Sequence, residues 1–350
     1  MKRILLVIDH LGVGGVQEFF LNVVRDGREL ARFTVLSLFA NDVYSQRLRE
    51  AGAEVIFCSE RDYNVVNVAR LSGIGRYRAY LRDNAGRFDR IHVRLFAAFL
   101  YSSLIGLYRR KGVSAGLDAG RRQLPWYVFA VFVVFARKYE TFFIPAAYWD
   151  EYGALRLRPG QLAPVQYLVT DRRAAKPAAL QHRRNVLTIG RCIPQKGFLE
   201  VIGLFARMSA LTREDIGLFI IGDGPDRPRL EQEVASRGLR NVHCVGTVLE
   251  LDPYMAAADM VIKMAFGEGI NSVVRESLLA GKVVAMTLET EECREFADAG
   301  LVVPIDRAHP DAAARRLVAF LEGRERIDVA RAVERVQSSG ERLRIVNALC

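Results

Sequence analysis

The chain has 350 residues, enough for about two domains, and 51% of them are apolar, which excludes a disordered protein. Five scattered cysteines with no C-x-x-C pair exclude a disulfide framework and a cysteine zinc site, and they predict a reducing, cytoplasmic environment. The net charge of +10 lies in the first half: residues 1–175 hold 26 basic and 16 acidic side chains, whereas residues 176–350 hold 24 of each.

The first half of the chain alternates short apolar runs with amphipathic stretches. The runs predict strands at residues 4–8, 33–39, 54–58 and 90–93, with helices at 16–24, 43–51 and 66–82. A glycine-rich turn, Gly12-Val-Gly-Gly15, follows the first strand, but it lacks the G-x-G-x-x-G spacing of a nicotinamide dinucleotide site, which we therefore reject. The alternation predicts a mostly parallel sheet with helices on both faces.

The second half repeats this plan. Strands are predicted at residues 185–190, 217–222, 241–245, 260–262, 283–286 and 301–303, with helices at 197–208, 228–237, 253–257 and 271–280. The fold class is therefore α/β, with two Rossmann-like doubly wound domains, 1–175 and 176–350, facing each other across a cleft. We expect the last helix to pack back on the first domain. Such sheets bind ligands at the carboxyl ends of their strands.

Two strand exits in the second domain suit an anion. The first brings Arg191 and Lys196 to the start of a helix, where backbone N–H groups, the helix dipole and two cations favour a diphosphate. An ordinary turn with two solvated cations is the alternative. The second exit is Gly222-Asp-Gly-Pro225. Its residues also favour an ordinary tight turn, so this segment by itself does not indicate a ligand site.

A pair of glutamates stands eight residues apart in the segment 267–282. Glu276 falls among apolar residues of a predicted helix, where a carboxylate needs partners; ribose hydroxyls would supply them. A solvated glutamate on the helix face is the alternative. Glu268 precedes the helix and is placed to hold hydroxyls of a bound sugar.

Five motifs follow one another along the second half of the chain: Gly190-Arg-x4-Lys-Gly197, Gly222-Asp-Gly-Pro225, Val245-Gly246, Tyr254-x3-Ala258-Asp259 and Glu268-Gly-x6-Glu276-x3-Ala280-Gly-Lys282. Together they resemble the C-terminal domain of retaining glycosyltransferases of family 4, which have the GT-B fold and include bacterial polysaccharide and lipopolysaccharide enzymes. The match spans residues 185–305. Gly14-Gly15 resembles the N-terminal donor loop of the family more loosely.

The resemblance implies a nucleotide-diphosphate sugar as donor, with Arg191 and Lys196 on the diphosphate and Glu276 on the ribose. Glu268 would contact the transferred sugar, and with Arg191 and Lys196 it makes the expected catalytic set. Further donor contacts are implied for Gly14, Gly15, Gly222, Thr247, Val248, Leu249, Gly269, Asn271, Ser272 and Val273. The family acts without a metal or cofactor and retains anomeric configuration, most simply by front-face attack without a protein nucleophile.

The sequence departs from the family at two places. Lys263-Met-Ala-Phe-Gly267 stands where the family often has Pro-Ser before its Glu-Gly. The family also has a histidine near its fifth N-terminal strand, and this chain has none there. Asp118 and His92 are the acceptor-side candidates in its place, although a lone histidine such as His92 is more typical of a structural role.

Two N-terminal stretches, 95–108 and 124–136, are rich in aromatic residues and end in basic clusters. Both are shorter than a transmembrane helix. One interpretation is that these stretches are buried helices with basic ends. The other is contact with an anionic membrane surface, which agrees with the net charge of +10 on residues 1–175 and with a lipid-linked acceptor. Nucleic acid is disfavoured because no helix-turn-helix, RRM or zinc-finger pattern occurs.

The resulting hypothesis is a retaining glycosyltransferase that joins a sugar to a glycan or lipid-linked acceptor, in the cytoplasm or at the inner face of the membrane. A UDP-sugar 2-epimerase-like isomerase has a similar two-domain shape but needs acid–base groups that we do not find as a convincing set. A catalytically inactive relative that binds a partner is the third hypothesis.

Overall fold

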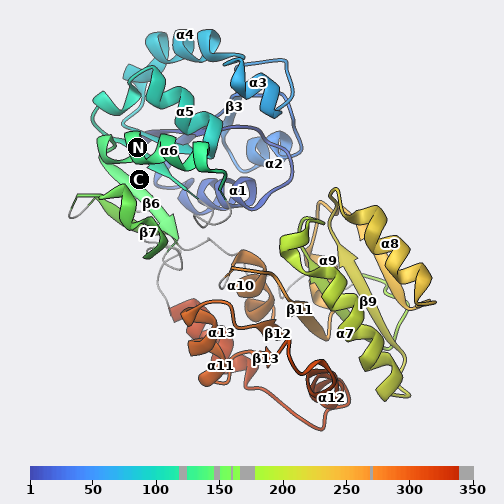
Figure 1. The fold of residues 1–350 in the computed structure, drawn as a ribbon. Coiled ribbons are helices and arrows are strands. Elements are labelled where there is room, and N and C mark those ends of the chain that lie inside the picture. Colours follow the sequence, from blue (N-terminus) through green and yellow to red (C-terminus); the bar gives the residue numbers. More distant parts are fainter. Residues whose placement is uncertain (118–123, 146–149, 159–160, 166–177, 269–270, 339–350) are drawn as a thin grey trace. The chain divides into compact units, whose positions relative to one another are not determined.

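The computed structural model describes residues 1–117, 124–145, 150–158, 161–165, 178–268 and 271–338. The chain divides into two compact units, one within Met1–Leu168 and one within Val169–Ser339 (Figure 1). The predicted domain boundary after residue 175 lies outside the described residues, as do residues 339–350 at the C-terminus. The last helix that the structure describes, Val329–Ser338, packs on Ser272–Leu279 of the second unit, so the expected packing of the last helix on the first domain is not found among the described residues.

The first unit contains a parallel sheet in the order β3-β2-β1-β4-β5-β6-β7. Its strands are β1 (Lys2–Ile8), β2 (Ala31–Ser37), β3 (Glu54–Phe57), β4 (Arg90–Arg94), β5 (Val113–Gly116), β6 (Thr141–Pro145) and β7 (Leu162–Val165). Residues Ile4 to Ile8 of β1 are all fully buried. A strand that is covered on both faces needs apolar side chains at every position, which explains the continuous apolar run at residues 4–8 of the sequence.

Helices cover both faces of this sheet. On one face lie α1 (Gly15–Gly27) and α2 (Ser45–Glu50); on the other lie α3 (Val65–Ala69), α4 (Ile74–Asn84), α5 (Phe96–Leu104) and α6 (Trp126–Phe135). Short 3-10 turns are η1 (Ala85–Arg87), η2 (Leu107–Arg109), η4 (Ala136–Lys138) and η6 (Asp150–Leu155).

The single helix predicted over residues 66–82 is wrong. The structure has two helices there, α3 and α4, separated by Arg70–Gly73. Leu71 in this break has φ +51°, outside the right-handed helical region, so the backbone turns between the two helices. Hydrophobic periodicity continues through the break, which is why the pattern alone missed it.

The second unit contains a parallel sheet in the order β10-β9-β8-β11-β12-β13. Its strands are β8 (Arg184–Ile189), β9 (Ile216–Ile221), β10 (Val242–Gly246), β11 (Met260–Lys263), β12 (Val283–Thr287) and β13 (Val303–Ile305). Its helices are η7 (Pro194–Lys196), α7 (Phe198–Leu211), α8 (Arg227–Ser236), α9 (Asp252–Ala257), α10 (Ser272–Leu279), α11 (Glu291–Asp298), α12 (Pro310–Leu321) and α13 (Val329–Ser338).

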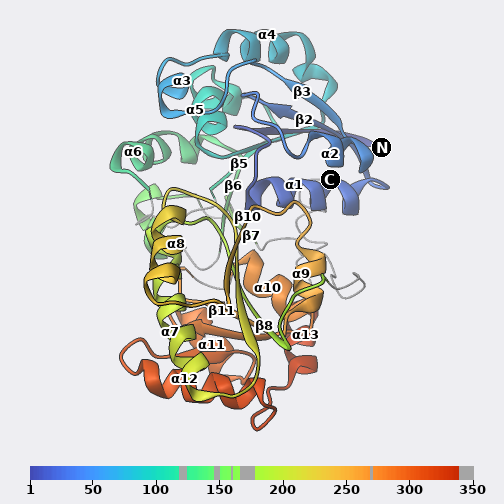
Figure 2. The same cartoon turned by 90° about the vertical axis from the view of Figure 1, so that its right-hand side faces the viewer.

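These helices again form two layers on the sheet. α7, α8 and α12 share one apolar core with the sheet, while α9, α10 and α13 pack on the opposite face (Figure 2). Both units are thus doubly wound parallel α/β sheets, as the sequence predicts.

Candidate active site

The predicted donor residues of the second unit gather where the strand order reverses. β8 is followed along the chain by β9 on one side, whereas β11 lies on its other side. The loops that leave β8 and β11 therefore diverge from neighbouring strand ends, which is the position where doubly wound sheets bind ligands.

Close backbone packing joins the loops after β8, β9 and β10. The Gly190 N–H donates to the Ile221 carbonyl (3.0 Å), and the Gly222 N–H donates to the Gly246 carbonyl (2.8 Å). Gly222 has φ +135°, and a Cβ atom there would lie 1.8 Å from the Gly190 carbonyl oxygen. Only glycine fits this position.

The loop after β8 also packs on the loop after β11. Gly197 has φ +66°, and a Cβ atom there would lie 2.1 Å from the Met264 carbonyl oxygen. The Phe266 N–H donates to the Gln195 carbonyl (2.7 Å). This contact brings η7, which ends at Lys196, against the segment that carries Glu268.

Glu268 lies at the centre of a charged cluster. Its Oε1 atom is 2.6 Å from the Lys196 ammonium, and its Oε2 atom is 3.7 Å from the Lys263 ammonium. Oε2 also accepts a hydrogen bond of 3.1 Å from Asn271 Nδ2. Burial lowers the pKa of Lys263, although the neighbouring Glu268 carboxylate opposes that effect. Two lysines and one glutamate leave the cluster with one excess positive charge, which suits an anionic ligand.

The N-terminus of α10 borders this cluster. Asn271 caps the helix by accepting a hydrogen bond from the Val274 N–H (3.2 Å), and Ser272 and Val273 form its first turn. The positive end of the helix dipole adds to the charge of the two lysines. Glu276 lies in the next turn and is only 5% exposed, so the structure places it on the packed side of the helix rather than in solvent.

The other predicted residues of the second unit lie at neighbouring strand exits. Arg191 follows β8 with an exposed side chain. Thr247, Val248 and Leu249 follow β10, and Val248 packs on the core while Leu249 is 57% exposed. Gly269 is outside the described residues.

The first unit holds the remaining candidates. Gly14 and Gly15 begin α1 directly after the β1 loop. His92 is 2% exposed; its Nδ1 atom lies 2.9 Å from the Ser114 hydroxyl, and its ring packs edge-on against Phe143. Burial lowers the pKa of His92 well below its usual value. These contacts favour the structural interpretation of His92. Asp118 is outside the described residues.

The roles of Lys263 and Arg307 were not predicted from the sequence. In the sequence, Lys263 marks only a departure from a family motif. In the structure it is the last residue of β11, and its ammonium lies 3.7 Å from Glu268 Oε2. Arg307 follows β13: its guanidinium donates to the Met264 carbonyl, pairs with Glu289 and lies 4.0 Å from the centre of the Phe266 ring. Glu289 in turn accepts the Gly267 N–H (3.3 Å). Arg307 thus holds the loop that carries Glu268, and a lone arginine after a strand gave no signal of this.

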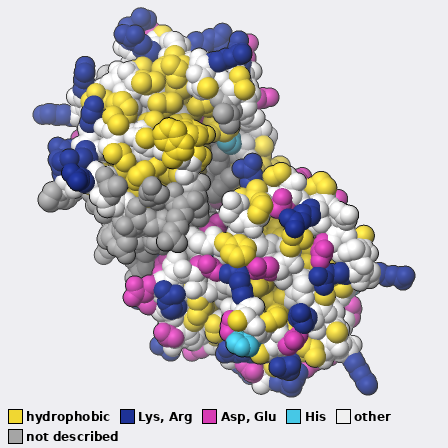
Figure 3. Space-filling view, viewed as in Figure 1, with side chains coloured by type: hydrophobic (Ala, Val, Ile, Leu, Met, Phe, Trp, Pro, Cys, Tyr) yellow, Lys and Arg dark blue, Asp and Glu magenta, His cyan; other side chains and the backbone are white. Residues whose placement is uncertain are grey.

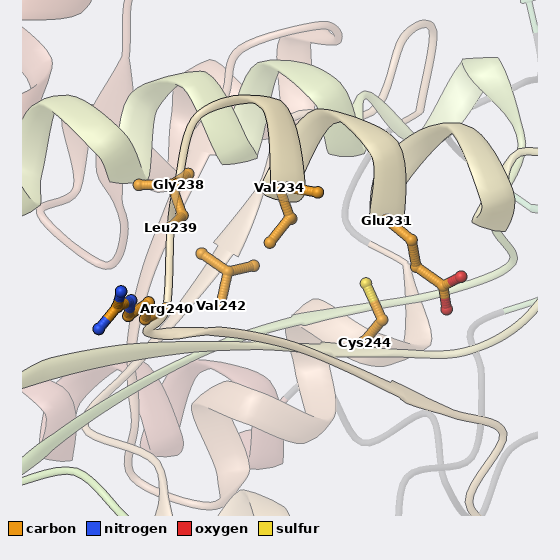
Figure 4. A pocket seen from close by; sticks show the side chains of 8 residues that line it. Glu231, Val234, Gly238, Leu239, Arg240, Val242 and Cys244 are labelled. Carbon is orange, nitrogen blue, oxygen red and sulfur yellow. The ribbon is translucent and has the colours of Figure 1, made fainter.

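A pocket of about 290 Å³ lies elsewhere in the second unit, between α8 and β10 (Figure 4). Glu231, Val234, Leu239, Val242 and Cys244 line it, and none of its lining residues belongs to the predicted site. Among the described residues no three His, Cys, Asp or Glu side chains form a group that could hold a metal ion.

Comparison with known proteins identifies the second unit. Residues 183–323 match the family model "Glycosyl transferases group 1". This segment is a group 1 glycosyltransferase domain. It contains all the described site residues of the second unit, and it confirms the resemblance that the five motifs predict. A search of curated proteins finds no match.

Solved structures similar to the whole chain are glycosyltransferases at low sequence identity. HepE of Anabaena, solved in complex with UDP and glucose, is 15% identical with a TM-score of 0.72, covering 97% of this chain and 99% of HepE. Sucrose-phosphate synthase of Thermosynechococcus elongatus is 16% identical with a TM-score of 0.73, covering 99% and 97%. WaaG, a glycosyltransferase involved in lipopolysaccharide biosynthesis, is 14% identical with a TM-score of 0.71, covering 99% of each chain. These likenesses establish the GT-B fold.

Proposed function

We propose that the protein is a retaining glycosyltransferase that transfers a sugar from a nucleotide-diphosphate sugar to a glycan or lipid-linked acceptor. The observation that carries this proposal is the Lys196–Glu268–Lys263 cluster at the start of α10, within a group 1 glycosyltransferase domain. HepE, which shares the fold, was solved with UDP and glucose, which supports a uridine nucleotide as the first donor to test.

The residues in and around the cluster have separate proposed roles in donor binding. Lys196, the exposed Arg191 and the N–H groups of Ser272 and Val273 hold the diphosphate and stabilise the charge that develops on it as it leaves. Glu276 binds the ribose and Glu268 the transferred sugar. No metal takes part in this proposal, because the two cations and the helix dipole neutralise the leaving group.

The proposed reaction is a front-face substitution at the anomeric carbon. The bond from that carbon to the diphosphate oxygen breaks, the bond to the acceptor hydroxyl oxygen forms on the same face, and the hydroxyl proton passes to the departing phosphate. Configuration is retained without a covalent intermediate, so no protein nucleophile is required.

The acceptor is proposed to lie at the cytoplasmic face of a membrane. The +10 charge of residues 1–175 favours an anionic surface over a neutral one. In the part of the chain that the structure describes, no helix is long and apolar enough to span a bilayer.

Thermal-shift measurements with UDP, GDP, ADP and dTDP test the donor site first. We expect at least one nucleotide to raise Tm, and Lys196→Met or Glu276→Gln to abolish most of that shift while Lys282→Met does not. Lys282 follows the C-terminal end of α10. It is a suitable control because it is half-buried and donates to the Ala256 carbonyl of α9. If no nucleotide diphosphate changes Tm, the binding-partner hypothesis replaces this one.

Product analysis then tests the reaction. Incubation with a nucleotide sugar and lipid-linked acceptors, in EDTA, should give a product whose anomeric configuration by NMR equals that of the donor. An inverted product or a strict metal requirement would contradict the mechanism. Conversion of the nucleotide sugar to an epimer without any acceptor would favour the isomerase.

A further inference from the structure

The exposed face of α6 is apolar. The side chains of Trp126, Tyr127, Ala130, Val133 and Val134 are exposed, with Trp126 at 80% and Val134 at 57%. Their spacing of one, three, three and one residues places them on one side of the helix. The opposite side, with Val128, Phe129 and Phe132, packs into the core. A surface helix normally has polar residues on its exposed side, whereas α6 is apolar on both sides.

Exposed cations border this apolar face. η4 continues α6 directly and carries Arg137 and Lys138, whose ammonium lies 4.8 Å from the Phe135 ring and 5.2 Å from the Tyr108 ring. The Tyr108 and Phe135 rings are 6.3 Å apart, which places η2, with Arg109 and the following Lys111, beside η4.

The charge of this segment is almost entirely positive. Residues 104–139 contain seven Lys or Arg side chains and one acidic side chain, Asp118. Glu140 follows, but it is already paired with Arg90 (3.2 Å). Figure 3 shows hydrophobic side chains gathered on the face of the first unit where Figure 1 shows α6, with Lys and Arg side chains at the margins.

We infer that this surface, defined as the exposed face of α6 with η2 and η4, binds an anionic lipid bilayer. Exposed Trp and Tyr side chains are suited to the headgroup region, where an amphipathic ring has both an apolar and a polar neighbour. Nearby Lys and Arg side chains add attraction to anionic headgroups. The charge around the apolar face favours this occupant over a second copy of the chain, whose identical surface would bring like charges together.

The inference deepens the proposed function, and in naming a membrane partner it rests on the lipid-linked acceptor. The surface itself can be measured without any nucleotide. Its failure is therefore distinguishable from failure of the donor site, which the UDP-induced Tm shift reports.

Vesicle sedimentation tests the surface with the full chain. We expect binding to vesicles containing phosphatidylglycerol and little binding to phosphatidylcholine alone. The double variant Trp126→Ser, Val134→Ser should weaken binding by about tenfold or more, whereas Val66→Ser should not. Val66 is 55% exposed on α3 of the same unit, so it controls for removal of an exposed apolar side chain. Tm and the UDP shift of each variant verify that both units remain folded.

Charge reversal gives an independent comparison. Arg137→Glu with Lys138→Glu should weaken binding by about tenfold or more, and Arg76→Glu with Arg78→Glu on α4 should have a smaller effect although the net charge changes equally. Equal effects would mean that the overall charge, not this surface, attracts the vesicles, and would overturn the inference.

Fluorescence reports insertion directly. Trp149→Phe leaves Trp126 as the sole tryptophan, and its emission should shift to the blue on anionic vesicles. No shift, equal binding of wild type and the Trp126/Val134 variant, or a dimer by light scattering that this variant abolishes without any vesicle binding would each overturn the inference.

Discussion

The Glu268 carboxylate contacts two lysines, Lys196 and Lys263, and the two have different roles. Lys196 is paired with Glu268 rather than solvated. A diphosphate that binds Lys196 must compete with this carboxylate. Lys263 stays beside Glu268 and keeps the cluster positive, so its charge favours the ligand although it need not touch it.

Lys263→Met should therefore weaken UDP binding by about tenfold without lowering Tm. Methionine has a similar length, and its burial carries no charge to desolvate, so stability is preserved. Isothermal titration calorimetry gives the affinity, with Lys282→Met as the control that removes a half-buried lysine charge beyond the C-terminal end of α10. Unchanged affinity in Lys263→Met would show that its charge does not contribute.

The affinity should also depend on pH in a defined direction. Because burial lowers the pKa of Lys263, this lysine loses its charge at a lower pH than an exposed lysine would. UDP affinity of the wild type should fall as the solution becomes alkaline, and this alkaline loss should be smaller in Lys263→Met. Parallel pH profiles for the two proteins would contradict the assignment.

At the scale of elements, the end of β1 is tied to the start of α5 by one buried acid. Asp9 is 1% exposed and accepts hydrogen bonds from the N–H groups of Ala97 (3.0 Å) and Ala98 (2.6 Å). Burial raises the pKa of Asp9 to about 7, although these two hydrogen bonds oppose the effect. Asp9 was not among the residues singled out from the sequence.

The raised pKa fixes the sign of a pH effect on stability. The folded state keeps a proton on Asp9 between about pH 4 and pH 7, where the unfolded state has lost it. Asp9 therefore contributes stability at low pH that is lost as the pH rises through 7. Urea unfolding across this range should show a weaker pH dependence in Asp9→Asn, while Asp83→Asn on the exposed surface of α4 should keep the wild-type slope. An unchanged slope in Asp9→Asn would mean that the native group is ionised throughout.

The contact between the exits of β8 and β9 gives a second prediction at this scale. Gly222→Ala would place a methyl group 1.8 Å from the Gly190 carbonyl oxygen in a backbone conformation that alanine avoids. We expect a loss of several degrees or more in Tm and of the UDP-induced shift. Gly203→Ala in the interior of α7 is the matched control; its added methyl group meets no atom within 4 Å and should raise Tm slightly. Similar Tm values for the two variants would show that the loops can separate.

For the whole molecule, the two proposed ligands should protect different units. UDP should slow amide hydrogen exchange in the segments around Lys196 and at the start of α10, all in the second unit, because the predicted phosphate contacts are there. Anionic vesicles should slow exchange in α6 and its neighbouring turns in the first unit. Protection by UDP restricted to the first unit would contradict the donor site.

The sequence predicted the doubly wound plan because its signals are local. Apolar runs report strands buried on both faces, and residues that follow such runs lie at the carboxyl edge whatever the rest of the chain does. For this reason Arg191, Lys196, Gly222 and Glu268 could be placed at strand exits from the sequence. Their roles in donor binding stay predictions, while the group 1 glycosyltransferase match confirms the resemblance that the motifs carry.

Contacts between distant segments were decided only by the tertiary structure. Lys196 and Glu268 are 72 residues apart, and the burial of Lys263 beside them depends on the pairing of β8 with β11. The aromatic stretches that form α5 and α6 look alike in sequence, yet neighbouring elements cover α5 while one face of α6 is left exposed. Composition fixes how much apolar surface a segment offers; whether that surface is covered depends on which elements pack against it.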